Sequence, residues 1–322
     1  MNSYKNEDMP PTCRYEFQPT EWAEAHDEPS PLQEEWSCPR DAVEDAEFCP
    51  FHLSPDERAN AGINSEELSQ QLRSELVSKD SPSLRLVGAT LPGFDISTLV
   101  IDRPTNNPID LRHATIEGNL QAVEAAIHQP LLLEQATING QVDVSGAEFG
   151  YAVHCDGIDI RGSCTFEDVT FADTVSFREG TVRREITFKG SEFQRKADFY
   201  GFEAVANSVF RNTVWEMDCL FQSARFDGRA DFFSATFHQL ADFRGVTFEG
   251  VSRFSKSEFE REALFLDADF DRAALFKKFG SSPMHTSSRL ILPPRPLSQK
   301  RPLAARRNSN SLSLTEKCRS RM

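Results

Sequence analysis

Tyrosine, tryptophan and lysine are all scarce in this sequence. It has 26 phenylalanines against 4 tyrosines and 3 tryptophans, and only 9 of its 35 basic residues are lysine. No apolar run approaches the roughly 18 residues that a membrane span requires, and the start, MNSYKNEDMPPT, lacks the basic-then-apolar pattern of a signal peptide. The sequence therefore predicts a cytoplasmic chain without a membrane span.

Catalytic signatures are also missing from the sequence. It contains no P-loop, no G-x-G-x-x-G, no H-E-x-x-H and no G-x-S-x-G pattern, so we expect no enzyme and no catalytic residues. Seven cysteines, an odd number without a secretory signal, argue against a disulfide framework. Metal ligation and simple burial are the two uses that remain for them.

Acidic residues exceed basic ones by 15, and the excess is unevenly spread. Residues 1–110 carry a net charge of −14, residues 111–280 carry −9, and residues 281–322 carry +8. An acidic surface with few lysines is typical of halophilic proteins, whose carboxylates hold water while salt screens their repulsion. The sharper interpretation of the same charge is a surface that mimics DNA.

What the sequence has in quantity is an eleven-residue repeat of large apolar residues, and 18 of the 21 positions in its two series are phenylalanine. The first series contains Phe166, Phe177, Phe188, Phe199, Phe210, Phe221, Phe232, Phe243, Phe254, Phe265 and Phe276. The second contains Phe171, Val182, Phe193, Ala204, Trp215, Phe226, Phe237, Phe248, Phe259 and Phe270. Both continue towards the N-terminus as smaller, mostly aliphatic residues, so the repeat starts near Ile109.

A small residue stands two positions before most of these centres, with a polar residue between them, as in Ala230-Asp231-Phe232. This is the alternation of a short strand whose small and large residues face inward. Four such faces make a coil of about 22 residues, and stacked coils make a parallel β-helix. The alternative is a right-handed helical coiled coil, which also repeats every eleven residues. It is disfavoured because the two series lie on different helical faces.

The segments Ala230-Asp231-Phe232 and Ala241-Asp242-Phe243 resemble the pentapeptide-repeat family, in its Phe-rich five-plus-six variant. The resemblance covers about half of the chain. It implies an all-β solenoid, a right-handed quadrilateral β-helix, over residues 109–279. It carries little information on function.

Residues 1–56 contain Cys13, Cys38, Cys49 and His52 in the spacing C-x24-C-x10-C-x2-H. Three thiolates and one imidazole are a suitable ligand set for a structural Zn²⁺, and so short a region needs a metal to fold. We therefore predict a zinc-binding Cys3His segment, while coincidence remains the alternative. Similar Cys/His segments precede pentapeptide repeats in haloarchaeal proteins, which the resemblance adds.

Residues 57–108 are expected to cap the solenoid. Asn64 followed by carboxylates predicts a helix start, and Leu68, Leu72 and Leu76 line one face of a helix of about 15 residues. Such a helix would cover the open end of the first coil, which residues 84–108 form irregularly.

Residues 280–322 are basic and rich in serine, proline and arginine, and they predict a disordered tail that is not another coil. The tail has two interpretations, an arm that contacts nucleic acid or membrane and the product of a frameshift near Gly280. With the second, the end of the β-helix lacks a cap, and a homodimer through that open end would cover it.

For function we expect a rigid scaffold or protein-interaction module with an unknown protein partner. Nucleic acid is not expected as a partner. The first alternative is the cytoplasmic regulatory domain of a truncated, channel-like membrane protein. The second comes from the family resemblance, since some members mimic B-DNA and occupy the DNA groove of type II topoisomerases. Arg178, Arg211 and Arg244 among the outward acidic residues weaken that alternative.

Overall fold

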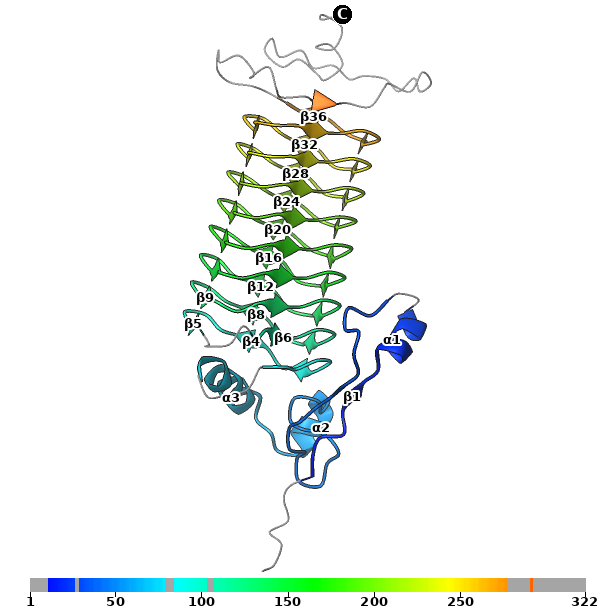
Figure 1. The fold of residues 1–322 in the computed structure, drawn as a ribbon, viewed down its shortest axis with the longest axis vertical. Helices are drawn as coiled ribbons and strands as arrows, with labels where there is room; N and C mark the ends of the chain where they lie inside the picture. Colours follow the sequence, from blue (N-terminus) through cyan, green and yellow to red (C-terminus); the bar gives the residue numbers. More distant parts are fainter. Residues whose placement is uncertain (1–10, 27–28, 79–83, 103–106, 277–289, 292–322) are drawn as a thin grey trace, which may run out of the picture.

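The computed structural model describes residues 11–26, 29–78, 84–102, 107–276 and 290–291. Among these residues, three helices precede the solenoid: α1 (Pro19–His26), α2 (Pro55–Asn60) and α3 (Ser65–Val77). Strands β1 (Glu16–Phe17) and β2 (Trp36–Ser37) pair antiparallel beside them. Above these elements rises a tall stack of regular coils, with the N-terminal segment at its foot (Figure 1).

The solenoid has four faces, each a parallel sheet of two-residue strands. Face 1 consists of β6 (Ile109–Asp110), β10 (Leu131–Leu132), β14 (Val153–His154), β18 (Val175–Ser176), β22 (Ala197–Asp198), β26 (Cys219–Leu220), β30 (Ala241–Asp242), β34 (Ala263–Leu264) and β37 (Leu290–Ile291). Face 2 consists of β3 (Thr90–Leu91), β7 (Thr115–Ile116), β11 (Thr137–Ile138), β15 (Asp159–Ile160), β19 (Thr181–Val182), β23 (Glu203–Ala204), β27 (Arg225–Phe226), β31 (Thr247–Phe248) and β35 (Asp269–Phe270).

Faces 3 and 4 complete each coil. Face 3 consists of β4 (Phe94–Asp95), β8 (Leu120–Gln121), β12 (Val142–Asp143), β16 (Cys164–Thr165), β20 (Ile186–Thr187), β24 (Ser208–Val209), β28 (Ala230–Asp231), β32 (Ser252–Arg253) and β36 (Ala274–Leu275). Face 4 consists of β5 (Val100–Ile101), β9 (Ala126–Ile127), β13 (Glu148–Phe149), β17 (Thr170–Phe171), β21 (Glu192–Phe193), β25 (Val214–Trp215), β29 (Thr236–Phe237) and β33 (Glu258–Phe259).

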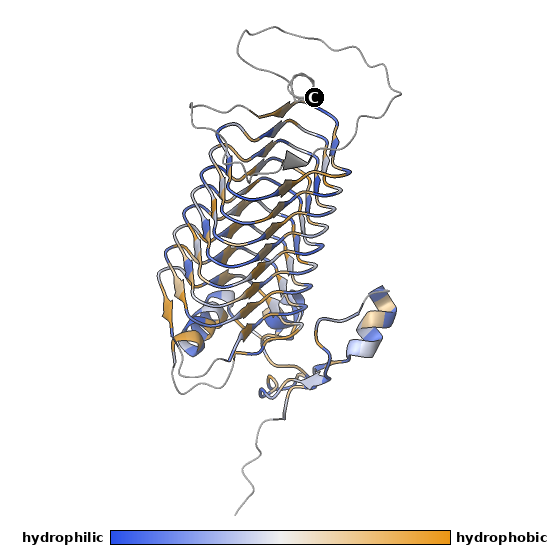
Figure 2. Cartoon of the chain, turned by 45° about the horizontal axis from the view of Figure 1, so that its top comes forward, coloured by the Kyte–Doolittle hydropathy of each residue, from blue (hydrophilic) through white to orange (hydrophobic). Residues whose placement is uncertain are grey.

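The strand register confirms the predicted β-solenoid. Leu131 pairs with Ile109 below it and with Val153 above it, a step of 22 residues in each direction. Two eleven-residue units therefore make one coil, and each phenylalanine series alternates between two faces. Hydrophobic and hydrophilic residues alternate along every coil (Figure 2).

The interior of the solenoid is filled by stacked aromatic rings. On face 3, Phe210 stacks between Phe188 and Phe232 at centroid separations of 5.3 and 4.6 Å. It also meets Phe199 and Phe221 of face 1 edge-on. Offset stacks along a face and edge contacts between faces are the arrangements that the charge distribution of aromatic rings favours. Ring packing therefore adds to the hydrophobic burial that holds the coils together.

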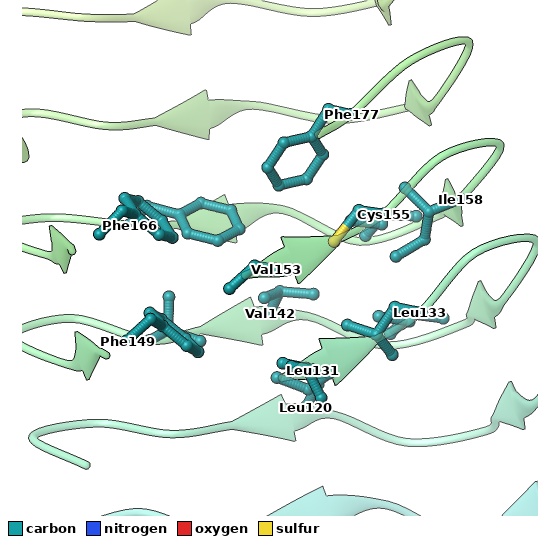
Figure 3. Close-up of a pocket in the computed structure, with 14 residues that line it drawn as sticks. Leu120, Leu131, Leu133, Val142, Phe149, Val153, Cys155, Ile158, Phe166 and Phe177 are labelled. Atoms are coloured by element: carbon teal, nitrogen blue, oxygen red, sulfur yellow. The ribbon is translucent and has the colours of Figure 1, made fainter. Parts of the chain in front are cut away.

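The core changes from aliphatic to aromatic between the coil that starts with β10 and the coil that starts with β18, as the sequence predicts. At this junction lies an entirely apolar cavity of about 30 Å³, between Leu131 and Leu133 on one side and Phe166 and Phe177 on the other (Figure 3). A space of this size holds about one water molecule and no ligand. The interior of the solenoid is therefore a packed core.

The corners of the coils share a backbone feature that the sequence analysis does not anticipate. The residue two positions after each centre of the first series has a positive φ, between 53° and 75°, from His113 to Asp267. These residues are His113, Glu124, Gln135, Gly146, Gly157, Asp168, Glu179, Gly190, Gly201, Asn212, Ser223, Ser234, Gly245, Lys256 and Asp267. Recurrent glycine at this offset was the available signal, since glycine adopts φ > 0 without steric cost.

A β-branched residue at such a corner should destabilise the solenoid. Gly245 has a φ of 65°, and a Cβ there would meet only the Ser223 residue, at 3.7 Å or more. The effect of Gly245→Val is therefore conformational, and we expect a loss of about 2 kcal/mol in the free energy of unfolding. Gly245→Asn is the control, because Asn212 adopts the same conformation one and a half coils earlier. Equal denaturation midpoints for the two variants would contradict the prediction.

Helix α3 covers the first coil, where the sequence predicts a cap. Asn64 accepts a hydrogen bond from the Glu66 N–H, and the helix has 13 residues. Leu68, Leu72 and Leu76 are buried, and α3 contacts β4 and β5. Strands β3 to β5 already pair with the next coil. Parallel pairing therefore begins with the bridge between Arg85 and Asp110 and continues with β3 at Thr90.

The basic tail contributes a strand that the sequence analysis does not expect. Leu290–Ile291 pairs in parallel with Ala263–Leu264 on face 1. The rest of the predicted tail lies outside the described residues. In the part of the chain that the structure describes, no helix is long and apolar enough to span a membrane.

Candidate metal centre

The four residues predicted as zinc ligands come together at the foot of the solenoid. The ligand atoms of Cys13, Cys38, Cys49 and His52 all lie within 4.8 Å of one another. The Cys38 and Cys49 Sγ atoms are 3.8 Å apart, and His52 Nδ1 lies 3.7 Å from Cys13 Sγ and 3.2 Å from Cys49 Sγ. All three cysteines are buried. Within the described residues this is the one cluster with the make-up of a metal site.

The imidazole of His52 is held in a fixed orientation. Its Nε2 lies 3.0 Å from the Val87 carbonyl oxygen, and its ring stacks on Tyr15 with centroids 4.0 Å apart. The carbonyl can only accept, so Nε2 carries the proton and donates it. In the neutral imidazole, Nδ1 is then the unprotonated nitrogen, and it faces the sulfurs of Cys13 and Cys49. Histidine ligands of metals are commonly oriented by such a second hydrogen bond.

The donor set and spacing fit a tetrahedral ion. With Zn–S bonds of about 2.3 Å and Zn–N bonds of about 2.0 Å, ligand atoms are about 3.5 to 3.8 Å apart. The hydrogen bond that Cys49 donates to Cys38, together with burial, raises the pKa of the Cys49 thiol to about 12, and burial raises the pKa of Cys13. Three buried thiolates thus need a compensating cation, which a bound divalent metal would supply. Four protein ligands leave no position open for substrate.

Hydrogen bonds and ion pairs attach this segment to the solenoid. The Thr90 N–H donates to the Phe51 carbonyl at 2.8 Å, one residue before His52. Arg58 is buried and donates to the Leu53 and Thr90 carbonyls and to Glu117. Folding of the cluster and docking on the first coil are therefore coupled.

The segment around α1 contacts the corner of the next coil, which the sequence analysis missed. The ring of His113 stacks on Phe17 with centroids 4.4 Å apart, and Trp22 packs against it at 4.8 Å. Burial lowers the pKa of His113 to about 4. The imidazole is thus neutral at pH 7 and acts as a packing surface. No spacing in the sequence links residues 17 and 113.

The coil geometry and the repeat pattern can be compared with known protein families. The family model described as Pentapeptide repeats (9 copies) matches residues 232–278. Residues 232–278, which include the last coils of the solenoid, therefore match the pentapeptide-repeat family. Comparison with curated proteins and with solved structures gave no match.

The aspartate of the pentapeptide-repeat motif has a structural role. Asp198, Asp231 and Asp242 point outward, as predicted, but they are buried rather than exposed. One carboxylate oxygen of each accepts the backbone N–H two residues later, which closes the corner. The other oxygen is paired with basic side chains, as Asp242 is with Arg244 at 2.6 Å. These carboxylates are therefore neutralised and do not form an acidic surface.

Removing one of these carboxylates should destabilise the coil. Asp231 has 1% of its side chain exposed and accepts from Phe233 N–H and from the guanidinium groups of Arg211 and Arg229. Asp231→Asn keeps the shape but loses the charge, and we expect it to lower the free energy of unfolding by about 2 kcal/mol. Glu249→Gln, at an exposed ion pair with Arg225, is the control and should have no measurable effect. Chemical denaturation of the two variants checks the difference.

Three further cysteines and one histidine of the described residues lie apart from the metal cluster. Cys155, Cys164 and Cys219 are buried inside the coils, and burial raises their thiol pKa values. His238 lies on the outer surface between Glu216 and Glu260 of adjacent coils. The hydrogen bond to Glu260 raises its pKa. Both carboxylates are 22 residues away in the sequence, so no local spacing indicates them.

Proposed function

We propose that this pentapeptide-repeat protein is a non-catalytic scaffold: a rigid rod whose outer faces bind a protein partner. The observation that carries the proposal is the interior of the described coils, where aromatic rings stack and the apolar cavity at the aliphatic-to-aromatic junction measures about 30 Å³. Since a space of this size admits no ligand, recognition belongs to the outer side chains. A parallel ladder of hydrogen bonds on all four faces resists bending.

We further propose that the Cys3His cluster holds one structural Zn²⁺ and that residues 1–56 fold around it. Residues 57–108 then cap and begin the solenoid, and residues 109–279 form the rod. The coupling of His52 to Val87, and of Phe51 to Thr90, supports a role for the metal in fixing the first coil. Bound metal would supply the folding energy that a segment with so small a core lacks.

The paired aspartates argue against the DNA-mimic alternative. A DNA mimic requires an unbroken negative face, whereas the repeat aspartates are covered by arginines. A regulatory role beside a membrane segment has no specific observation in its favour among the described residues. The scaffold is therefore the function that the arrangement supports best.

Photocrosslinking from each face tests the scaffold proposal. A photoreactive amino acid is placed at an outward strand position of each face in turn: His154, Thr137, Thr187 and Thr236. In extracts of the native host we expect one face to give a single defined product that unlabelled protein competes away. Absence of a product from all four faces, or identical products from all four, would overturn the proposal.

A further inference from the structure

Three arginines gather around one buried aspartate on face 3. Arg211 and Arg229 each approach Asp231 Oδ2 to 2.6 Å, and Arg253 lies 3.8 Å from the same oxygen. Their side chains are 40%, 44% and 29% exposed, while that of Asp231 is 1% exposed. The cluster therefore carries two positive charges more than its own carboxylate neutralises. Asp242 on face 1, in contrast, pairs with the single cation Arg244.

These arginines retain hydrogen-bonding capacity towards solvent. A guanidinium has five N–H donors, and the bonds to Asp231 use only one or two from each. Arg253 is further oriented by stacking on Phe233, with its guanidinium carbon 4.1 Å from the ring centroid. A buried carboxylate below and an aromatic ring beside them thus position the guanidinium groups in advance of binding, which lowers the entropic cost of recognition.

An open groove of about 470 Å³ runs along face 3 to this cluster. Its floor consists of Thr165, Thr187 and Val209, the outward residues of β16, β20 and β24, and these side chains are short. Arg211 and Arg229 line its basic end. At the other end Lys189 pairs with Glu167, and Glu185 also lines the groove, so that part carries one net negative charge. The strands labelled β16 to β28 in Figure 1 mark its course.

We propose that the basic end of this groove, with the adjacent Arg253, binds an extended segment of the protein partner through the carboxylates of its Asp or Glu side chains. Arginine pairs with carboxylates through two parallel hydrogen bonds, which gives direction as well as charge. The inference rests on the proposed scaffold function, because it assigns a face and a chemistry to that partner.

The surroundings favour a narrow peptide over nucleic acid. Face 4, the next face along the coil, carries Glu192, Glu216 and Glu258 without comparable arginine cover, and the whole chain has a net charge of −15. A broad polyanion would contact these carboxylates and be repelled. A peptide chain lying within the groove reaches the arginines without meeting them.

Peptide binding to the full-length protein tests this inference. The probe is a fluorescein-labelled octapeptide rich in glutamate, compared by fluorescence anisotropy with a glutamine octapeptide and a single-stranded oligonucleotide. We expect the glutamate peptide to bind most tightly and salt to weaken it. The double variant Arg211→Gln/Arg229→Gln should weaken binding by about tenfold or more.

A second variant keeps the test valid if the double variant folds poorly. Thr187→Glu puts a carboxylate on the groove floor and leaves the arginines and Asp231 in place. It should therefore also weaken binding of the glutamate peptide. Thr247→Glu on face 2, beside Arg225, is its matched control and should bind normally. The inference is overturned if the glutamate peptide does not bind at millimolar concentration, if Thr187→Glu binds it normally, or if the oligonucleotide alone binds. A defined photocrosslink from another face, without peptide binding here, would support the scaffold function and refute the proposal for this groove.

Discussion

The Cys49→Ser variant is expected to lose the proposed metal and, with it, the fold of the N-terminal segment. Cys49 is fully buried and its sulfur lies 3.8 Å from that of Cys38 and 3.2 Å from His52 Nδ1. A serine hydroxyl is a poor zinc ligand, and the other three side chains would remain buried without their ion. If the metal is present at a thousand times its dissociation constant, its loss removes about 4 kcal/mol of stability.

The measurement combines metal content with thermal unfolding. We expect about one equivalent of zinc in the unaltered protein, consistent with one tetrahedral site, and substantially less in Cys49→Ser. A chelator should lower the unfolding midpoint of the unaltered protein and leave that of Cys49→Ser unchanged. Cys164→Ala is the matched control, because Cys164 is buried in the solenoid and belongs to no metal cluster. A Cys49→Ser protein that still carries one equivalent would refute the proposed site.

The effect of the metal should be local to the lower end of the rod. Val87 and Thr90 receive the contacts of the cluster, and they belong to the first coil. In a repeat protein each coil contacts only its neighbours, so loss of an end cap frays the adjacent coils first. Hydrogen exchange should therefore increase around β3 and β7 in Cys49→Ser before it increases near β28.

The fold could be predicted from the sequence because one physical constraint repeats. Each coil must place one large and one small residue inward per face. Residues of these two kinds, such as Phe232 and Ala230, therefore recur every eleven positions. The metal ligands could also be singled out, since few other residue types bind zinc. Their mutual contacts follow from chain folding over 39 residues, which spacing alone does not determine.

What could not be predicted depends on side chains from different coils. Asp231 was placed correctly on the outside, but its burial results from arginines 20 and 22 residues away on neighbouring coils. Likewise, Phe17 and His113 stack only because the N-terminal segment turns back along the first coils. Period and hydropathy specify which way a side chain points. They do not specify what covers it.

The Phe210→Ala variant should be the most destabilising single change in the rod. Phe210 is fully buried, at the centre of the ring stack, between Phe188 and Phe232. Removing the ring leaves a cavity that the hydrogen-bonded coils above and below cannot close, because their spacing is fixed by the ladders. We expect the free energy of unfolding to fall by about 3 to 5 kcal/mol.

A leucine at the same position separates the loss of volume from the loss of an aromatic ring. Leu133 is buried at a first-series centre in an early coil, so the solenoid accommodates this side chain. Phe210→Leu should therefore cost less than about 1.5 kcal/mol. Denaturant unfolding followed by tryptophan fluorescence measures both variants, since Trp215 lies 6.3 Å from Phe210 between ring centroids. If Phe210→Ala were no worse than Phe210→Leu, ring stacking and tight packing would not be what holds the coils in register, and the rigidity on which the scaffold function depends would need another source.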